Sequence, residues 1–552
     1  MQQKFLEKTL GQQIADMAAK YPDDNMIDYT DRDYSRTWKE FNDECETIAR
    51  GFMALGLKKG SHISIWGTNV PAWLLTFFGS AKMGGILVTV NTSYKVFELD
   101  YQLKQSDSEA IVLIDGYKGT SYTDIINELC PELESCEPGK LKSRRLPLLK
   151  SVIYAGEGEC PAGMVDWKEL YTLAEKTSVE EFEAVRDSCD CHEVVNIQYT
   201  SGTTGFPKAI LHRHRALVCS CVTEQHHHGQ TKDDVFLCIP PLYHTGAKMH
   251  WFGSLISGGK AVLLRGVKPE WILRTVTEEK CTIVWLLVPW AQDILDAIES
   301  GRVNLEHYLL DQWRLMHIGA QPVPPSLIKR WLKYFPHHKY DTNYGLSESI
   351  GPGCVHLGVD NIEKIGAIGK AGYLWQTRIL DERGNDVAPG EIGELAVKGP
   401  GVMKCYYKNP EATAEILHGD WLWTGDMARE DKDGFIYLVD RKKDVIISGG
   451  ENLYPVQIED FLRRNEKIKD VAVIGLPDQR LGEIAAAIIE LKDGADCTET
   501  EIQDFCRELP RYKRPRRVIF AKVPRNPTGK IEKPVLRQIY CGGRLVEEQT
   551  KA

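Results

Sequence analysis

A short segment rich in glycine and hydroxyl residues follows a stretch that is typical of a buried β-strand. The strand is expected over 194–199, and it leads directly into Thr200-Ser-Gly-Thr-Thr-Gly-Phe-Pro-Lys208. Glycines let backbone N–H groups turn toward an anion, hydroxyls add donors, and the lysine adds a positive charge. These residue types therefore predict a site for phosphate groups. A surface turn of small residues is the alternative. The segment is not a Walker loop, because only two residues separate its glycines and Pro207 precedes the lysine.

Seven further strings follow this loop along the chain. They are Pro240-Pro-Leu-Tyr-His244, Gly319-Ala-Gln-Pro322, Asn343-Tyr-Gly-Leu-Ser-Glu348, Trp423-Thr-Gly-Asp426, Asp440-Arg-Lys-Lys-Asp444 with Ile447-Ser-Gly-Gly-Glu-Asn452, and Asn526-Pro-Thr-Gly-Lys530. Together with the loop, they resemble the motifs of the adenylate-forming enzymes, the superfamily of acyl-CoA synthetases, peptide-synthetase adenylation domains and beetle luciferases. The resemblance extends from about Gly11 to Leu536.

The resemblance implies a reaction in two halves. A carboxylate attacks the α-phosphorus of ATP and expels pyrophosphate, and a thiol then attacks the acyl-adenylate and expels AMP. Because two anions approach each other in the first half, positive charge and N–H donors must offset their repulsion. The implied small molecules are a carboxylic acid, ATP with Mg²⁺, and coenzyme A as co-substrate.

By the resemblance, the catalytic residues are Lys530, Lys208 and Glu348. Lys530 is expected to reach from a small C-terminal domain to the acyl carboxylate and the α-phosphate, and Lys208 to hold the β- and γ-phosphates. Glu348 is expected to bind Mg²⁺, which takes few protein ligands beside ATP phosphates and waters. Without the resemblance, Lys530 would be read as a solvated turn residue and Glu348 as a carboxylate at a helix start.

The resemblance also assigns residues to each bound group. Contacts to ATP or AMP are expected from Thr200, Ser201, Gly202, Thr203, Thr204, Gly205, Lys208, Gly319, Ala320, Gln321, Asn343, Tyr344, Gly345, Leu346, Ser347, Asp426, Arg441 and Lys530. Ser347 stands where the family commonly has threonine, and it keeps the hydroxyl. The acyl pocket is expected from His244, Thr245, Ala247, Trp251, Ile318 and Leu346, and the coenzyme A tunnel from Ser448, Gly449, Gly450 and Glu451. Lys443 falls on the hinge position, where a backbone rotation would swing the small domain between half-reactions.

An α/β fold must position these residues. From about residue 60, short apolar runs alternate with helix-period segments, a pattern typical of parallel sheets with crossover helices. Strands are expected over 63–66, 86–90, 110–114, 152–154, 235–239, 261–264, 282–288 and 315–318, with helices over 269–280 and 324–335. After residue 366, short strands separated by turn signals predict a small β-barrel-like subdomain.

A compact α+β pattern follows the charged run 440–444. We therefore predict an N-terminal AMP-binding domain over 1–442, made of two parallel-type α/β subdomains and the β subdomain. A small mobile α+β domain is predicted over 443–552.

Composition and charge exclude some classes of function. A net charge of −10 argues against a general nucleic-acid binder. The most apolar stretch, 71–90, is interrupted by Lys82 and Gly84-Gly85, so it predicts a buried helix and a strand rather than a membrane span. The N-terminus lacks the features of a signal peptide, and the cysteines have no regular spacing. We expect a cytoplasmic protein that is a monomer or homodimer.

A metal site near Cys219, Cys221 and the histidines 226–228 is the weaker reading. The spacing matches no familiar zinc pattern, so core cysteines beside an exposed His run are expected.

Two features favour coenzyme A as the acyl acceptor. The stretch 240–245 lacks the aspartate that pairs with an amino-acid substrate in adenylation domains, and no carrier domain follows Lys530. The bulk of Trp251 favours a medium-length, branched or ring-bearing acid, although a tryptophan that packs helices would look the same. Two alternatives stay open: an enzyme that hands the acyl group to a carrier protein or amine, and a non-catalytic nucleotide-binding relative.

Overall fold

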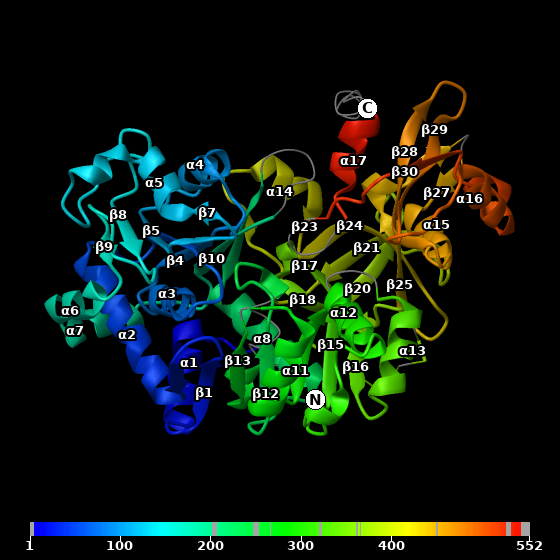
Figure 1. Ribbon diagram of the computed structural model, residues 1–552. Coiled ribbons are helices and arrows are strands. Elements are labelled where there is room, and N and C mark those ends of the chain that lie inside the picture. Colours follow the sequence, from blue (N-terminus) through cyan, green and yellow to red (C-terminus); the bar gives the residue numbers. More distant parts are fainter. Residues whose placement is uncertain are drawn as a thin grey trace. The chain divides into compact units, whose positions relative to one another are not determined.

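The computed structural model in Figure 1 describes most of the chain. It covers residues 5–200, 207–246, 253–264, 266–319, 323–359, 361, 363–364, 366–448, 451–525 and 531–541. Twelve predicted site residues lie outside it: Ser201, Gly202, Thr203, Thr204, Gly205, Ala247, Trp251, Ala320, Gln321, Gly449, Gly450 and Lys530. Backbone contacts divide the chain into two units, Met1–Thr377 with Val397–Leu422 and Arg378–Ala396 with Trp423–Ala552.

An eight-stranded sheet in the first unit has the order β22-β11-β10-β4-β3-β5-β8-β9. It is parallel from β10 to β9, while β10, β11 and β22 pair antiparallel. Its strands are β3 (His62–Trp66), β4 (Ile86–Thr89), β5 (Ala110–Leu113), β8 (Ser151–Tyr154), β9 (Val165–Asp166), β10 (Val194–Tyr199), β11 (Ala209–Arg213) and β22 (Cys405–Tyr406). The parallel part confirms the strands predicted over this region.

The helices of the N-terminal part of this unit are blue to cyan in Figure 1. They are α1 (Leu10–Lys20), α2 (Trp38–Ala54), α3 (Pro71–Lys82), α4 (Val96–Gln105), α5 (Tyr122–Leu129), α6 (Glu169–Leu173) and α7 (Val179–Asp187), with a small hairpin of β6 (Gly116–Tyr117) and β7 (Thr120–Ser121). Helix α3 is buried from Ala72 to Lys82 and leads into β4, as predicted for 71–90. Among the described residues, no helix is both long and apolar enough to cross a membrane.

A seven-stranded sheet forms the second α/β layer of this unit, in the order β16-β15-β14-β12-β13-β1-β2. All its pairs are parallel except β1 with β2. The strands are β1 (Asn25–Tyr29), β2 (Tyr34–Thr37), β12 (Val235–Cys238), β13 (Lys260–Leu263), β14 (Ile283–Leu287), β15 (Leu315–Gly319) and β16 (Lys339–Asp341); the helices are α8 (His214–His228), α10 (Ser254–Ser257), α11 (Pro269–Glu278), α12 (Val288–Glu299) and α13 (Pro325–Tyr334). Proline begins α11 and α13, as predicted.

Two smaller sheets follow. One has the order β17-β18-β19, and the other β20-β21-β24-β23, with β25 beside β24. Their elements are β17 (Asn343–Leu346), β18 (Gly351–His356), β19 (Lys370–Ala371), β20 (Gln376–Leu380), β21 (Gly393–Lys398), α14 (Pro410–Ile416), β23 (Leu417–His418), β24 (Trp421–Glu430) and β25 (Ile436–Arg441). The elements from β19 to β25 follow residue 366, where the small β subdomain was predicted, whereas β17 and β18 precede it.

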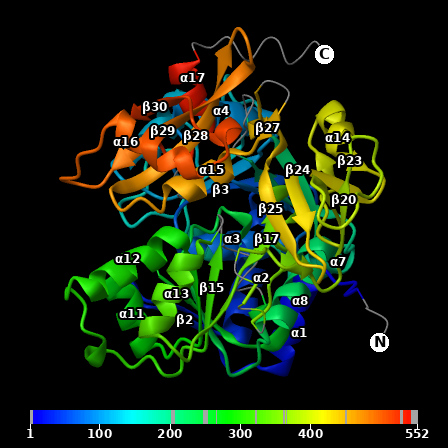
Figure 2. The same ribbon diagram turned by 90° about the vertical axis from the view of Figure 1, so that its right-hand side faces the viewer.

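The C-terminal part is an α+β module, orange to red in Figure 2. Its elements are β26 (Ile446–Ser448), β27 (Glu451–Leu453), α15 (Pro455–Leu462), β28 (Ile468–Asp478), β29 (Gly482–Leu491), α16 (Glu499–Phe505), β30 (Arg517–Phe520) and α17 (Lys533–Tyr540). Because side chains alternate along a strand, β28 serves two cores. Val471 and Val473 pack with Ile458 of α15, whereas Ala472 and Ile474 pack with Leu536 of α17. A domain boundary after residue 442 stays a prediction.

Asp234 joins the starts of three parallel strands. Its carboxylate accepts two hydrogen bonds from Arg314 at 2.8 and 3.0 Å, and one from the Thr282 hydroxyl at 2.7 Å. These residues immediately precede β12, β15 and β14. Burial alone would raise the pKa of Asp234. The hydrogen bonds from Arg314 and Thr282 outweigh burial, so the net pKa shift is downward.

Replacing Asp234 with asparagine should lower the free energy of unfolding by about 2 kcal/mol. The side chain of Arg314 is 40% exposed, so the loss is smaller than for a fully buried pair. Because the folded-state pKa is lowered, the stabilisation is present above the ordinary value of about 4 and is lost as the pH falls through the folded-state pKa. Denaturant unfolding of both proteins at several pH values measures this difference. The neighbouring exposed Asp233→Asn should change stability by less than about 0.5 kcal/mol, and an equal effect of the two variants would refute the assignment.

Candidate active site

The predicted phosphate segment connects two strands of an antiparallel hairpin. Tyr199 at the end of β10 pairs with Ala209 at the start of β11, and the N–H of Thr200 donates to the carbonyl of Lys208 at 3.1 Å. Thr200 and Lys208 are therefore fixed by the sheet at the two ends of the segment. The predicted donors between them lie outside the described residues.

A tyrosine joins two of the predicted catalytic residues. The ammonium of Lys208 lies 4.9 Å from the centroid of the Tyr406 ring, and the Tyr406 hydroxyl donates to Oε1 of Glu348 at 2.7 Å. Strand β22 places this ring, because Tyr406 pairs with Ile210 of β11. Burial and the charge of Glu348 raise the pKa of Tyr406 far above its ordinary value, so the phenol remains a hydrogen-bond donor. The phosphate lysine and the predicted magnesium carboxylate thus contact the same side chain.

The turn that carries Glu348 is fixed by the backbone on both sides. Glu348 belongs to the short 3-10 helix Ser347–Ser349, and its carbonyl accepts from the N–H of Met403 at 2.8 Å. The N–H of Leu346 donates to the Ser349 hydroxyl at 3.0 Å. The next residue, Ile350, has φ 71°, a left-handed conformation that β-branched residues rarely adopt. Such strain is stored at functional turns when the surroundings fix it.

The predicted adenine motif forms strand β17. Asn343 pairs with His356 and Tyr344 with Val355 of β18, and the Tyr344 side chain is buried. Gly319 ends β15, and no described atom lies within 4 Å of a Cβ placed there. Parallel sheets bind ligands beyond the carboxyl ends of their strands, which is where Gly319 and Thr200 both lie.

The segment predicted to line the acyl pocket is held by two buried amides. The side chain of Asn69 bonds the carbonyl of Pro240 at 3.0 Å and the N–H of Leu242 at 2.9 Å, and Gln198 donates to the carbonyl of Tyr243 at 2.6 Å. These contacts fix the chain just before His244 and Thr245.

Thr245 and Leu346 both adjoin Gly351 of β18. A Cβ at Gly351 would lie 2.9 Å from the Thr245 hydroxyl oxygen, and Leu346 pairs with Gly351 in the sheet. The glycine, with φ 100°, permits this close approach. Ile318 is fully buried within β15. The structure thus brings one residue of the pocket segment beside the adenine motif.

The second unit contains the predicted ribose residues. Asp426 of β24 pairs with Arg441 of β25, and Arg441 Nε lies 2.6 Å from Asp426 Oδ1. The carboxylate is buried, whereas the arginine side chain is about half exposed. Gly425, with φ 71°, donates its N–H to Glu394 at 3.0 Å and so sets the turn before Asp426.

The predicted hinge residue Lys443 is exposed between two anchored aspartates. Asp440 accepts from the N–H of Val456 at 3.0 Å, and Asp444 accepts from Arg537 at 2.6 Å. Because Asp440 precedes Lys443 and Val456 follows it, a rotation at Lys443 would break the hydrogen bond between Asp440 and Val456.

Two further predicted loops are also closed at their ends. Ser448 pairs with Glu451 across 449–450, and Arg525 pairs with Ile531 across 526–530, the stretch that contains Lys530. Arg525 also bonds Asp470 at 2.7 Å. The structure therefore fixes where these loops begin and end.

A buried cluster of histidines and carboxylates lies behind the adenine motif and was missed by the sequence reasoning. It consists of Glu224 and His228 of α8, His317 of β15, Asp341 of β16 and His356 of β18, and all five side chains are fully buried. The expectation of an exposed His run is wrong at His228. Glu224 lies one helical turn earlier on the same face of α8, and this face points into the protein.

His356 bridges the two carboxylates of this cluster. Its ring nitrogens lie 3.2 Å from Asp341 Oδ2 and 3.2 Å from Glu224 Oε1. Burial lowers the pKa of His356, but the two carboxylates outweigh burial and raise it to about 9. Glu224 also lies 3.4 Å from the amide nitrogen of Asn343, so the cluster adjoins the predicted adenine residue.

No sequence signal pointed to Tyr406, because it lies 58 positions from Glu348 and between ordinary residues. For the buried cluster, the spacing of Glu224 and His228 was a usable signal. Residues four apart share a helix face, and two polar side chains that face a core need hydrogen-bonding or charged partners there.

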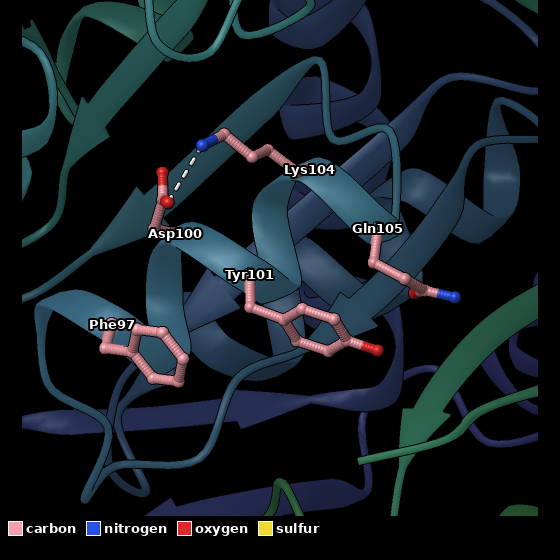
Figure 3. Close-up of a pocket in the computed structure, with 5 residues that line it drawn as sticks. All are labelled: Phe97, Asp100, Tyr101, Lys104 and Gln105. Carbon is pink, nitrogen blue, oxygen red and sulfur yellow. Dashed lines mark hydrogen bonds and ion pairs between the residues drawn. The ribbon is translucent and has the colours of Figure 1, made fainter. Parts of the chain in front are cut away.

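A shallow depression lies on α4, and Gln105, which lines it, accepts a hydrogen bond from the Tyr199 hydroxyl. Figure 3 shows Phe97, Tyr101 and Gln105 on one side of the helix, with the pair Asp100 and Lys104 beside them, 2.8 Å apart. None of the predicted site residues lines it. Phe97 is 65% exposed, so the depression offers no enclosed binding site.

Family models match both parts of the chain. Residues 14–407 match the AMP-binding enzyme family, and residues 457–530 match the AMP-binding enzyme C-terminal domain. The putative acyl-CoA synthetase YngI of Bacillus subtilis is 36% identical over 543 residues, covering 97% of each chain. The human mitochondrial medium-chain acyl-CoA ligase ACSF2 is 31% identical over 542 residues, covering 96% of this chain and 87% of that protein.

Solved structures agree with these matches. A fatty acyl CoA synthetase of Mycobacterium tuberculosis has a TM-score of 0.73 at 27% identity, covering 97% of this chain and 98% of that chain. ATP-bound MatB from Rhodopseudomonas palustris has a TM-score of 0.82 at 25% identity, covering 96% and 99%. The chain therefore belongs to the AMP-binding enzyme family, in which it is an ATP-dependent, AMP-forming acid–CoA ligase of the acyl-CoA synthetase group that uses Mg²⁺ and coenzyme A.

Proposed function

We propose that this ligase activates a medium-length carboxylic acid and that a site divided between two parts of the chain carries out the reaction. The observation that carries the adenylation part of the proposal is the contact of Lys208 and Glu348 with the same residue of the first unit, Tyr406. The length of the acid is supported by the relatives named medium-chain acyl-CoA ligases, which are 31 to 33% identical to this chain.

Adenylation is proposed to use motif residues from both parts of the chain. Lys208 and the donors of the segment after Thr200 bind the β- and γ-phosphates, and Asn343 and Tyr344 bind adenine between Gly319 and β18. The hydroxyl of Ser347 contacts the α-phosphate. Asp426 and Arg441 bind the ribose, and Lys530 acts on the acyl carboxylate and the α-phosphate. Positive charge around the α-phosphate lowers the repulsion between the two reacting anions.

Glu348 is proposed to hold Mg²⁺. Its carboxylate offers hard oxygen ligands, and Tyr406 and the turn around Ile350 fix its position. Magnesium needs few protein ligands when phosphates and waters complete its coordination shell. When bound, the ion supplies charge neutralisation at the phosphates.

The thioester half-reaction is proposed to follow a rotation at Lys443, with residues 443–552 moving as one domain relative to 1–442. The loop of Ser448, Gly449, Gly450 and Glu451 would then line the path of the pantetheine thiol. Nearby, Arg511–Lys513 contacts β27 and supplies positive charge for the phosphates of coenzyme A.

A cytoplasmic location and a monomeric or homodimeric state are also proposals. None of the fifteen cysteines, all of which the structure describes, forms a disulfide, and this is typical of a cytoplasmic protein. Sedimentation analysis distinguishes the monomer from the homodimer.

Pyrophosphate release with a panel of acids, measured with and without coenzyme A, tests the substrate and the acceptor. We expect release to be greatest with medium-length acids and a matching amount of acyl-CoA when the thiol is present. Release without any acyl-CoA would favour a carrier protein or an amine as the acceptor. Absence of pyrophosphate with every acid, from folded protein with magnesium, would support the non-catalytic relative.

Replacing Tyr406 with phenylalanine should lower the rate of adenylation about tenfold and raise the magnesium concentration needed by a similar factor. The ring beneath Lys208 remains, but the hydrogen bond that orients Glu348 is lost, and such outer contacts typically contribute at least this much to metal affinity. Pyrophosphate release as a function of magnesium measures both quantities.

Tyr407→Phe is the matched control for this variant. Its hydroxyl donates to Asp107 at 2.7 Å, away from Glu348, so its magnesium dependence should match that of the wild type. Identical magnesium curves for Tyr406→Phe and the wild type would disprove the positioning role of Tyr406.

Replacing Trp251 with alanine should shift the preference toward longer acids. Removing the indole frees volume at the proposed end of the acyl pocket, and each buried methylene changes selectivity by about tenfold or more. Competition between acids of different length in CoA ligation measures the ratio of kcat/KM. Trp271→Ala, at an exposed tryptophan of α11, is the control. An unchanged length preference in Trp251→Ala would mean that this residue only packs helices.

A further inference from the structure

The buried cluster behind the adenine motif has the dimensions of a metal site. Nε2 of His228 lies 3.0 Å from Nδ1 of His317 and 3.7 Å from Oδ2 of Asp341, and the last two atoms are 3.4 Å apart. A tetrahedral zinc ion with ligands at 2.0–2.1 Å separates its ligand atoms by about 3.3 Å. The three observed separations scatter around that value.

The same three distances fix where an ion would lie. The circle through the three atoms has a radius of about 2.0 Å, so a point just outside their plane lies at the normal zinc distance from all three. Two imidazoles and one carboxylate are also a ligand set that zinc takes in proteins. Glu224 Oε2 is 3.6 Å from His228 Nε2, close enough to hydrogen-bond a water at the fourth position.

Neighbouring groups are placed as outer contacts to these ligands. The N–H of Gly358 donates to Asp341 Oδ1 at 2.9 Å, and His356 contacts the carboxylates of both Asp341 and Glu224. The side-chain amide of Gln230 lies 3.2 Å from Nδ1 of His228, the ring nitrogen that faces away from the triad. Amide oxygen and nitrogen are interchangeable in such assignments, so Gln230 can accept from Nδ1–H while Nε2 binds a metal.

The charges of the cluster also favour a cation. Glu224 and Asp341 are two carboxylates in a fully buried place. Buried charges are paired or coordinate a metal, because an isolated charge in the interior is costly. A divalent ion between His228, His317 and Asp341 would supply the missing positive charge.

We propose that His228, His317 and Asp341 bind a Zn²⁺ ion, with a water beside Glu224 as the fourth ligand. The ion joins the last turn of α8 to β15 and β16. It thereby supports the strand ends from which Gly319 and Asn343 extend. This site is separate from the magnesium carboxylate Glu348, and the inference does not depend on the proposed substrate or on the roles of the catalytic residues.

Zinc analysis of untagged protein tests the proposal. We expect about one zinc per chain by mass spectrometry. X-ray absorption at the zinc edge should show nitrogen and oxygen ligands, including imidazole, at about 2.0–2.1 Å. His317→Gln and Asp341→Asn should each lower bound zinc at least about tenfold. If either variant fails to fold, the absorption spectrum of the wild type still decides the matter.

The group of Glu7, Cys191 and His192 provides a matched control. Among the described residues, it is the second group whose side chains lie close enough together to bind one metal ion. His192→Gln should retain the wild-type zinc content. Sulfur in the zinc shell, loss of zinc in His192→Gln or full zinc content in His317→Gln would overturn the proposal. Wild-type protein that remains without zinc after refolding with Zn²⁺ would also overturn it. In that case, a proton shared between His228 and His317 would explain the short distance between their ring nitrogens.

Discussion

Replacing Lys530 with alanine should lower the rate of acyl-adenylate formation by about a thousandfold, while thioester formation from supplied acyl-adenylate stays within about twofold of the wild type. The reason is electrostatic. In the first half-reaction a carboxylate meets an anionic α-phosphate, and Lys530 is the cation assigned to that point. In the second half-reaction the thiol attacks a neutral carbonyl carbon, and the proposed rotation at Lys443 has removed Lys530 from the site.

The surroundings of Lys530 make this variant a local change. The stretch 526–530 is closed by the bridge of Arg525 with Ile531, and Lys533 of α17 pairs with Glu459 at 2.9 Å. These contacts do not involve the Lys530 side chain, so the small domain should remain folded. Lys522→Ala, at an exposed lysine near the same loop, should keep both half-reactions. Equal loss of both half-reactions in Lys530→Ala would contradict the domain rotation.

The second large effect is expected from Glu348→Gln, which should lower adenylation by about a hundredfold at the magnesium level that saturates the wild type. Glutamine keeps an oxygen that accepts the hydrogen bond from Tyr406, so the turn should hold its shape. Only the negative charge is lost, and a neutral amide is a weak magnesium ligand. The loss should therefore exceed that of Tyr406→Phe, which keeps the charge and removes the hydrogen bond.

Pyrophosphate release across a magnesium titration measures this order. Glu415→Gln removes an exposed carboxylate on α14, on the chain that follows Tyr406, and it should behave as the wild type. If Glu348→Gln and Glu415→Gln lose activity equally, general surface charge rather than a bound ion explains the effect.

The parallel strands could be predicted from the sequence because their signal is local. Buried parallel strands read as short apolar runs, and the strands expected over 63–66, 110–114 and 315–318 agree with β3, β5 and β15 within one residue at each end. Strands β1 and β2 were not assigned. The pairing of β1 with β13, more than two hundred residues away, follows from the tertiary fold and leaves no local pattern, and β2 pairs with β1.

The candidate site likewise contains residues that local motifs identified and residues that they did not. Motifs identified Lys208 and Glu348, but they did not identify the tyrosine between them. That contact depends on the pairing of β22 with β11, two strands almost two hundred residues apart. The buried cluster escaped for a related reason: its members come from α8, β15, β16 and β18, and only Glu224 and His228 are near in sequence. Long-range pairing decides such contacts, whereas composition and periodicity describe neighbours along the chain.

The central claim is that the acid attacks the α-phosphorus of ATP and that the resulting adenylate reacts with coenzyme A. Acid labelled with ¹⁸O in both carboxylate oxygens tests it directly, with mass spectrometry of the products after one turnover. In the predicted reaction a carboxylate oxygen becomes the bridge to phosphorus and leaves with AMP. One labelled oxygen should therefore appear in AMP and one in the acyl-CoA carbonyl, with pyrophosphate unlabelled. Unlabelled AMP, or label in ADP or inorganic phosphate, would contradict the account.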